Sequence, residues 1–137
     1  MATMQSTEMK NNVQLCIDNL QSELFGLSRD LWSCPELAYQ ERRAHDRLVR
    51  FFSANDAWTV DSHYVLETAF RATWDPFGGE EGDAVLNVAF LCEYDALPGI
   101  GHACGHNLIA EVGAAGALGL KCALEKEANV PVRVKVL

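Results

Sequence analysis

The feature that most constrains the fold is the order of four segments in the last third of the sequence. Residues 85–92 form a nearly continuous apolar run, which is typical of a β-strand buried on both faces. A glycine-rich loop follows at 93–106, and residues 109–124 have the small side chains of a helix that packs closely on a sheet. Residues 130–137 are rich in valine and predict another strand. This order predicts a βαβ unit with parallel strands, and therefore an α/β fold with a mixed or parallel sheet.

The residues before this unit predict two helices and a hairpin-like region. Apolar residues recur at helical spacing in the first part of the chain until Pro35, which disfavours helical geometry in the residue before it. Proline is tolerated in a first helical turn, so a new helix is expected to start there. Residues 1–12 are polar, and we expect them to be disordered. The predicted elements are a helix over 13–33, a second helix over 35–53, strands within 58–74 and a turn over 75–83.

The composition is that of a soluble globular protein, with 49% hydrophobic and 22% charged residues. The formal net charge is −8 and no basic stripe is present, which argues against nucleic acid as a partner. The first residues lack the apolar region of a signal peptide, and no apolar run approaches the length that spans a bilayer. Five cysteines without regular spacing predict reduced thiols in a cytoplasmic protein that contacts no membrane. Of these, Cys16, Cys92 and Cys122 are expected to fill the core.

The glycine-rich loop carries the residues that indicate chemistry. His102, Cys104 and His106 occupy alternate positions, with Asp95 upstream. In an extended loop Cys104 and His106 would point the same way, and a thiolate with an imidazole suits Zn²⁺, or less selectively Mn²⁺ or Co²⁺. Asp95 is the candidate catalytic residue, because it would orient a metal-bound histidine; the alternative is a turn residue before Pro98. His102 is either a third polar group in the pocket or a structural hydrogen-bonding group, and we expect the second role. The residues alone leave open an ordinary glycine-rich loop with a buried cysteine.

Two separated motifs make the chain resemble the amidohydrolase branch of the M20 metallopeptidases. That branch carries Asp-Ala-Leu-Pro followed by His-x-Cys-Gly-His, and this sequence has the same strings at 95–98 and 102–106. An upstream Pro-Glu-Leu-x-x-x-Glu segment of the branch is matched at 35–41. The resemblance covers residues 13–137. It implies the N-terminal part of a metallopeptidase catalytic domain, truncated before the downstream half and the lid or dimerisation domain.

The resemblance implies a metal-dependent hydrolase of amide or peptide bonds, with Cys104 and His106 as ligands of a divalent cation. Trp32 and Asn107 depart from the bacterial pattern, as in an animal dipeptidase subgroup whose substrates are dipeptides with a basic C-terminal residue. The family's Glu-Glu pair, which supplies the general base and a further ligand, would follow Leu137, so the chain alone is expected to be inactive. The alternatives are an N-acyl amino acid amidohydrolase and a non-catalytic truncated isoform or fragment.

Two other classes of protein fit the sequence less well. A thiol redox protein that uses Cys104 would need a Cys-x-x-C partner, which the sequence lacks. Gly99 and Gly101 are not followed by the third spaced glycine of a dinucleotide-binding loop. The strand at 130–137 would lack its downstream neighbours, so its valines would be partly uncovered. We therefore expect a marginally stable chain, or one that forms homo-oligomers through that strand.

Overall fold

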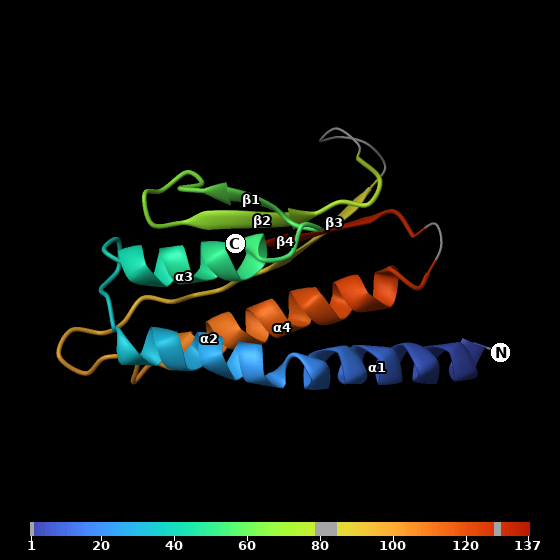
Figure 1. Ribbon diagram of the computed structural model, residues 1–137, viewed down its shortest axis with the longest axis horizontal. Helices are drawn as coiled ribbons and strands as arrows, with labels where there is room; N and C mark the ends of the chain where they lie inside the picture. The colour runs from blue at the N-terminus through green and yellow to red at the C-terminus, as the bar shows by residue number, and fades with distance from the viewer. Residues whose placement is uncertain (1, 79–84, 128–129) are drawn as a thin grey trace.

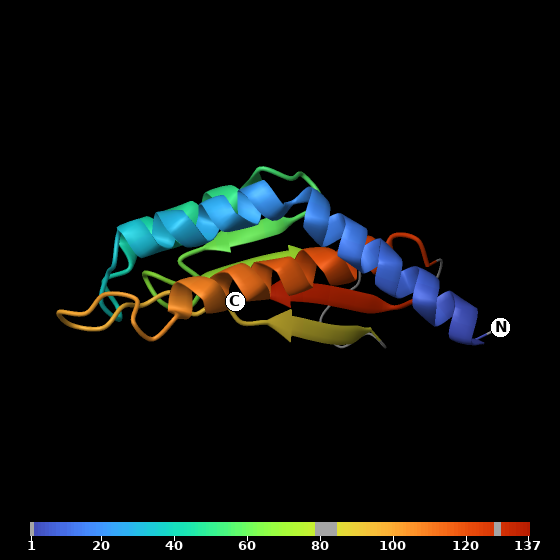
Figure 2. The same ribbon diagram turned by 90° about the horizontal axis from the view of Figure 1, so that it is seen from below.

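The computed structural model describes residues 2–78, 85–127 and 130–137 of the chain. In this part, four helices lie on one face of a four-stranded sheet (Figures 1 and 2). Helices α3 and α4 contact the strands, while α1 and α2 pack on α4. The sheet has the strand order β1-β2-β4-β3 and is mixed, so the predicted α/β fold is confirmed. The elements in chain order are α1 (Ala2–Asn19), α2 (Gln21–Ser33), α3 (Arg42–Ser53), β1 (Thr59–Ser62), β2 (Phe70–Trp74), β3 (Leu86–Phe90), α4 (His106–Leu124) and β4 (Val132–Val136).

The predicted βαβ unit is confirmed. Strands β3 and β4 are parallel neighbours, paired from Leu86 with Val132 to Phe90 with Val136, and α4 connects them. On its other side β4 pairs antiparallel with β2, which makes it an interior strand. Val132, Val134 and Val136 are buried. The expectation that its valines are partly uncovered is therefore wrong, because β2 and β3 pair with β4 on its two sides.

The open edge of the sheet next to this unit is β3. Within the described residues, β3 has a strand partner on one side only. Leu86 in β3 is 63% exposed, and Leu91, directly after the strand, is 60% exposed. Val88 and Phe90 are half-buried and pack against the core. The interpretation of 85–92 as a strand buried on both faces is therefore wrong, because a continuous apolar run does not reveal whether a strand lies in the middle or at the edge of a sheet.

The core lies between the sheet and α2, α3 and α4. Phe52 of α3 packs against Trp58 and Phe70, with ring centroids 5.2 and 5.9 Å apart. Helix α4 instead presents small residues to its neighbours, and three of its alanines are wholly buried. Small side chains allow α4 to lie close to β3 and β4. Its first turn is thereby held near the carboxyl end of β3.

The amino-terminal helices differ from the prediction. A single helix was expected over 13–33, but the chain has α1 and α2, which join at Leu20 with φ −100° and ψ 7°. Residues 1–12 were expected to be disordered, whereas α1 begins at Ala2. Val13 and Ile17 of α1 pack against α4 and hold the helix there. A polar composition suits an exposed helix as well as it suits a disordered segment.

The second predicted helix begins later than expected. Helix α3 does not start at Pro35, and the backbone at Tyr39 has φ 66°, a left-handed conformation that no helix contains. Glu36, the residue after Pro35, caps α3 from outside the helix. Its carboxylate accepts hydrogen bonds from the N–H groups of Arg43 and Ala44, both at 2.9 Å. A negative charge on these otherwise unpaired donors stabilises the start of a helix.

Two further expectations concern the hairpin and membrane-spanning segments. Strands β1 and β2 form an antiparallel hairpin within the predicted 58–74. The turn predicted over 75–83 lies partly outside the described residues. No apolar run of membrane-spanning length was expected, yet α4 is long and apolar enough by length and composition alone. That criterion is weak, because the core helix of an α/β domain also meets it, and α4 packs between the sheet and two other helices.

Candidate functional site

The loop between β3 and α4 lies at the carboxyl end of β3, beside the segment that joins α2 to α3 (Figure 2). Leu37 forms an isolated β-bridge with Ala96. The N–H of Ala96 donates to the carbonyl of Glu36 at 2.7 Å. The two motifs at 35–41 and 93–106, which are far apart in the sequence, therefore contact each other. In open α/β sheets this end of the strands is where ligands bind.

His106 lies between two carboxylates. Its Nδ1 is 2.7 Å from Asp95 Oδ1, and its Nε2 is 3.2 Å from Glu93 Oε2. His106 is the first residue of α4, and Gly105, with φ 83°, lets the chain turn into the helix at this point. A neutral imidazole has one N–H and donates to only one of the two carboxylates. With the N–H on Nδ1, the lone pair of Nε2 faces the carboxylate of Glu93.

Cys104 is exposed, and its Sγ lies 3.9 Å from the carbonyl oxygen of Asp95. Asp95 is thus the common neighbour of both motif residues, through its backbone to Cys104 and through its carboxylate to His106. The extended backbone expected to align these side chains is absent, because residues 102–104 form a turn and Gly105 is left-handed. The association of Cys104 with His106 comes from their shared contact with Asp95, and not from strand periodicity.

His102 and Asn107 attach the loop to α2. His102 is 4% exposed, and burial lowers its pKa, while a hydrogen bond with the backbone of Leu31 opposes the shift. Among the described residues, Nδ1 of His102 has no hydrogen-bond partner. Asn107 is also buried and donates from Nδ2 to Ser28 Oγ at 3.0 Å. This is a structural position for His102, in line with the role expected from the sequence.

Contacts behind the loop hold its beginning in place. Glu41, the last residue of the upstream motif, is 8% exposed and accepts a hydrogen bond from Thr68 Oγ1 at 2.7 Å. The hydroxyl of Tyr94 donates to the carbonyl of Thr68. Burial, and after it the nearby Glu41 carboxylate, raises the pKa of Tyr94 well above its ordinary value. Tyr94 therefore packs inward, while its two neighbours in the sequence contact His106.

Glu93 is the site residue whose importance the sequence did not reveal. Its side chain is 52% exposed, yet its carboxylate contacts Nε2 of His106. A usable signal was its spacing from Asp95. In an extended segment, side chains two positions apart lie on the same side of the backbone. Glu93 and Asp95 flank an inward-pointing tyrosine directly after a strand, so both face the same histidine.

The side chains of Glu93, Asp95, Cys104 and His106 are of the types that bind metal ions, but too few of them are arranged around one point. A thiol, an imidazole and two carboxylates are all ligands that Zn²⁺ accepts. Across residues 2–78, 85–127 and 130–137, however, no three His, Cys, Asp or Glu side chains are arranged to hold one ion. A structural zinc has four protein ligands and a catalytic zinc about three. The loop therefore offers part of the ligand set of a metal site.

The sequence is similar to two curated dipeptidases. A Mus musculus protein named Xaa-Arg dipeptidase is 58% identical over 125 residues, and its Homo sapiens namesake is 55% identical over 128 residues. These matches take in 88% and 89% of this chain but only 29% of each relative. The chain thus spans less than a third of the length of the relatives that it matches. No family model matches the chain.

A solved structure shares the fold. It is the crystal structure of a protein from methicillin-resistant Staphylococcus aureus described as an aminohydrolase, with a TM-score of 0.69 and 19% sequence identity. The match covers 90% of this chain and 34% of that one. At this identity the likeness shows the α/β architecture alone. The two dipeptidases, in contrast, are similar to the chain in sequence over most of its length.

Proposed function

We propose that the chain is part of a metal-dependent dipeptidase of the M20 type, which cleaves dipeptides with a basic C-terminal residue. The observation that supports this most directly is the 58% identity to an Xaa-Arg dipeptidase over 88% of the chain. A continuous match of that length includes the loop at 93–106, because the loop lies far from both ends of the sequence. The candidate site is thus within the region of high similarity.

In this proposal Cys104 and His106 hold one divalent cation, Zn²⁺ first, with Mn²⁺ or Co²⁺ as alternatives. A bound cation would supply Lewis-acid polarisation of the scissile carbonyl. Asp95 accepts the Nδ1 proton of His106, which fixes the ring and leaves Nε2 as the ligand atom. Glu93 adds a carboxylate 3.2 Å from Nε2, and its negative charge favours a cation at that position. The two carboxylates therefore orient His106 and add negative charge where a cation would bind.

We further infer that the chain by itself does not hydrolyse dipeptides. A catalytic zinc needs about three protein ligands and a base that moves the proton of the attacking water. Glu111, the next carboxylate after the loop, borders a hollow with Ile17 and Leu24 and so faces α1 and α2. An N-acyl amino acid is the alternative substrate, since the same loop chemistry serves either amide bond. A non-catalytic product that binds metal or partners is the alternative class.

Titration with Co²⁺ tests the metal-binding part of the proposal. A cobalt–thiolate absorption band is expected for the folded chain and should disappear in Cys104→Ser. Cys34→Ser is the matched control, because Cys34 is also a free cysteine but lies at the end of α2. The band should persist in that variant. A band that survives in Cys104→Ser would reject Cys104 as a ligand.

A chimaera tests the catalytic part. The chain would replace the matching region of the mouse Xaa-Arg dipeptidase, and hydrolysis of dipeptides that end in arginine or lysine would be measured. We expect activity in the chimaera, loss of activity in its Cys104→Ser variant, and none in the 137-residue chain alone. Turnover by the short chain that Cys104→Ser abolishes would contradict the inferred inactivity. A folded, metal-loaded chimaera that cleaves N-acyl amino acids and no dipeptide would favour the alternative substrate.

A further inference from the structure

Helices α1 and α4 pack side by side and run in opposite directions (Figures 1 and 2). At one end of the contact, Lys126 Nζ donates to Asn12 Oδ1 at 2.8 Å. Farther along, Gly119 faces α1 so closely that a Cβ placed on it would lie 3.1 Å from Val13 and 3.2 Å from Ile17. These contacts fix how the two helices align over about two turns.

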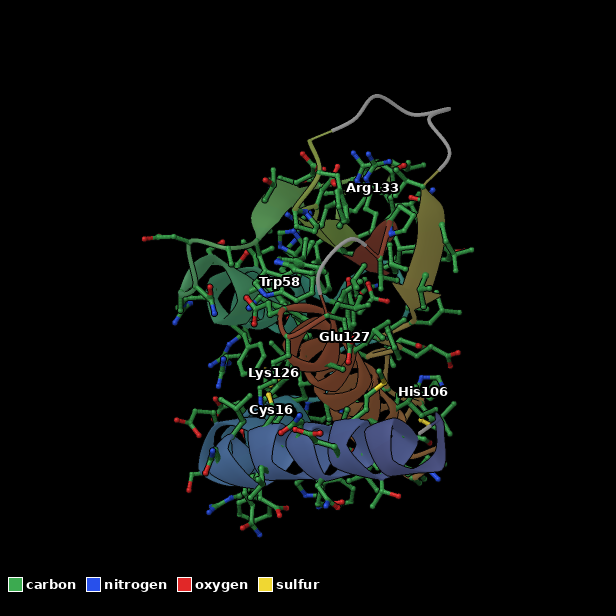
Figure 3. All side chains as sticks on the ribbon, turned by 90° about the vertical axis from the view of Figure 1, so that its right-hand side faces the viewer. Cys16, Trp58, His106, Lys126, Glu127 and Arg133 are labelled. Carbon is green, nitrogen blue, oxygen red and sulfur yellow. The ribbon has the colours of Figure 1, made fainter. Side chains whose placement is uncertain are left out.

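That alignment brings Cys16 opposite Cys122. Cys16 lies one helical turn after Asn12, and Cys122 lies one turn before Lys126, so they occupy matching positions on antiparallel helices. The Sγ of Cys16 is 3.8 Å from the carbonyl oxygen of Leu118, the residue one turn before Cys122. Figure 3 shows Cys16 where α1 meets α4. The two thiols thus face each other across the helix pair.

The accessibility, acidity and contact of the two thiols decide whether they react with each other. Both cysteines are free and half-buried, so small reagents reach them. Burial, and after it a hydrogen bond with the Cys122 thiol, raises the pKa of Cys16 to about 11, so less of Cys16 is thiolate; the contact between the two thiols, and not their acidity, favours their pairing. A disulfide needs Cα atoms about 4.4–6.8 Å apart, and helices whose axes lie roughly 8–10 Å apart bring facing Cα atoms, each about 2.3 Å from its axis, into that range. Gly119, three residues before Cys122, presents no side chain to α1 at this contact.

We propose that Cys16 and Cys122 form an oxidative modification site, which hydrogen peroxide converts to an intramolecular disulfide. One thiol loses its proton and attacks a peroxide oxygen; the O–O bond breaks, giving a sulfenic acid and one water. The second thiol then attacks the sulfenic sulfur, forms the S–S bond and releases a second water. The two thiols lose two electrons, and one peroxide is reduced to two waters.

The other three cysteines have different surroundings. Cys92 is buried, with its Sγ 3.4 Å from the carbonyl of Ala110. Cys104 lies on the loop beside Asp95, and Cys34 ends α2.

A disulfide between α1 and α4 would close a loop of roughly 100 residues, and cross-links that close long loops restrict the unfolded chain most. Oxidation would therefore lock α1, the outermost helix, onto α4.

Peptide mapping tests the proposal directly. The folded 137-residue chain is treated with hydrogen peroxide, its remaining thiols are blocked, and it is digested with trypsin without reductant. Cleavage after Lys10, Arg29, Lys121 and Lys126 leaves the two cysteines on peptides 11–29 and 122–126. We expect these two peptides to be the main disulfide-linked pair. The melting temperature should rise by roughly 10 °C and return to its original value on reduction.

Matched variants and an unfolded reference complete the experiment. Cys16→Ser and Cys122→Ser should each abolish the linked pair and the rise in melting temperature, whereas Cys34→Ser should retain both. The same oxidation in urea measures the pairing that chance encounters produce. The proposal is overturned if the linked pair is no more abundant in the folded chain than in urea. It is equally overturned if peroxide consumes Cys104 while Cys16 and Cys122 stay reduced. Neither outcome depends on the proposed hydrolase function.

Discussion

Substitution of Gly113 by alanine tests how α4 is held against the sheet. A Cβ on Gly113 would lie 2.5 Å from the carbonyl oxygen of Leu91 and 2.9 Å from Cys92 Sγ. The first neighbour is backbone and has no rotamer by which to move away. The adjoining N–H of Cys92 donates to the carbonyl of Leu137 at 2.7 Å, so the segment is also tied to the end of β4. Helix α4 itself must therefore shift.

The expected change in the free energy of unfolding of Gly113→Ala follows from two opposing effects. Alanine is favoured over glycine in a helix interior by about 1 kcal/mol. Overpacking of a close contact costs about 1–3 kcal/mol, and the upper end applies here because the obstacle is backbone. We expect Gly113→Ala to lower the free energy of unfolding by about 2 kcal/mol. Gly26→Ala in α2 is the matched control, because nothing lies within 4 Å of its added Cβ. That variant should gain up to about 1 kcal/mol.

Urea denaturation of the two variants and the wild type measures this difference. The free energies of unfolding of the two glycine-to-alanine variants should differ by about 3 kcal/mol, with opposite signs relative to wild type. Because α4 begins at His106, its shift should also weaken Co²⁺ binding in Gly113→Ala and leave it unchanged in Gly26→Ala. Equal stability of the two variants would refute the close approach of α4 to Leu91 and Cys92, which follow β3.

Three further predictions concern single carboxylates. Glu36→Ala should cost about 1 kcal/mol of stability in urea denaturation through loss of the α3 cap, whereas Glu23→Ala, in the first turn of α2, should cost less. Burial would raise the pKa of Asp75, but hydrogen bonds from Arg133 and two backbone N–H groups lower it overall. The stabilisation that Asp75 contributes is therefore present above its ordinary pKa of 3.8, and it is lost as the pH falls through the lower pKa of the folded state. Arg133→Met should cost about 3 kcal/mol at neutral pH and flatten this acid dependence in pH-dependent denaturation. Asp95→Asn should weaken Co²⁺ binding by about 10–100-fold in a spectroscopic titration while the thiolate band persists.

The elements of the fold were largely predictable, and their positions in the sheet were not. The βαβ unit follows from local composition, because strand, glycine loop and small-residue helix each have their own pattern. Strand order depends on contacts between distant residues. The continuous apolar run of β3 lies at an edge, while β4, which alternates valine with Arg133 and Lys135, is interior. Arg133 is buried there because Asp75, just after β2, pairs with it at 2.7 Å. No local pattern predicts that partner.

The candidate site was predictable where it is local. Asp95, Cys104 and His106 are close in the sequence, and the structure gathers them around Asp95. The geometry was not predictable, because the left-handed Gly105 starts α4 at His106 and ends the expected strand-like alternation. To predict the contact of Glu93 with His106 one would have to know that β3 continues into an extended segment before the loop turns. Residue type thus predicted which side chains lie together, while backbone conformation decided which of their atoms meet.

The upstream motif shows why two separated segments belong to one site. Glu36 ties together three parts of the chain, since its carboxylate caps α3 while its carbonyl receives the N–H of Ala96. Ala96 directly follows Asp95, so the backbone bond to Glu36 fixes the carboxylate that contacts His106. The side chain and the backbone of Glu36 therefore have separable roles. Removing the side chain weakens α3, whereas the position of Asp95 depends on the main-chain hydrogen bond, which the substitution leaves in place. The upstream motif thus contributes to the site through its backbone, and none of its side chains is among the contacts of His106 described above.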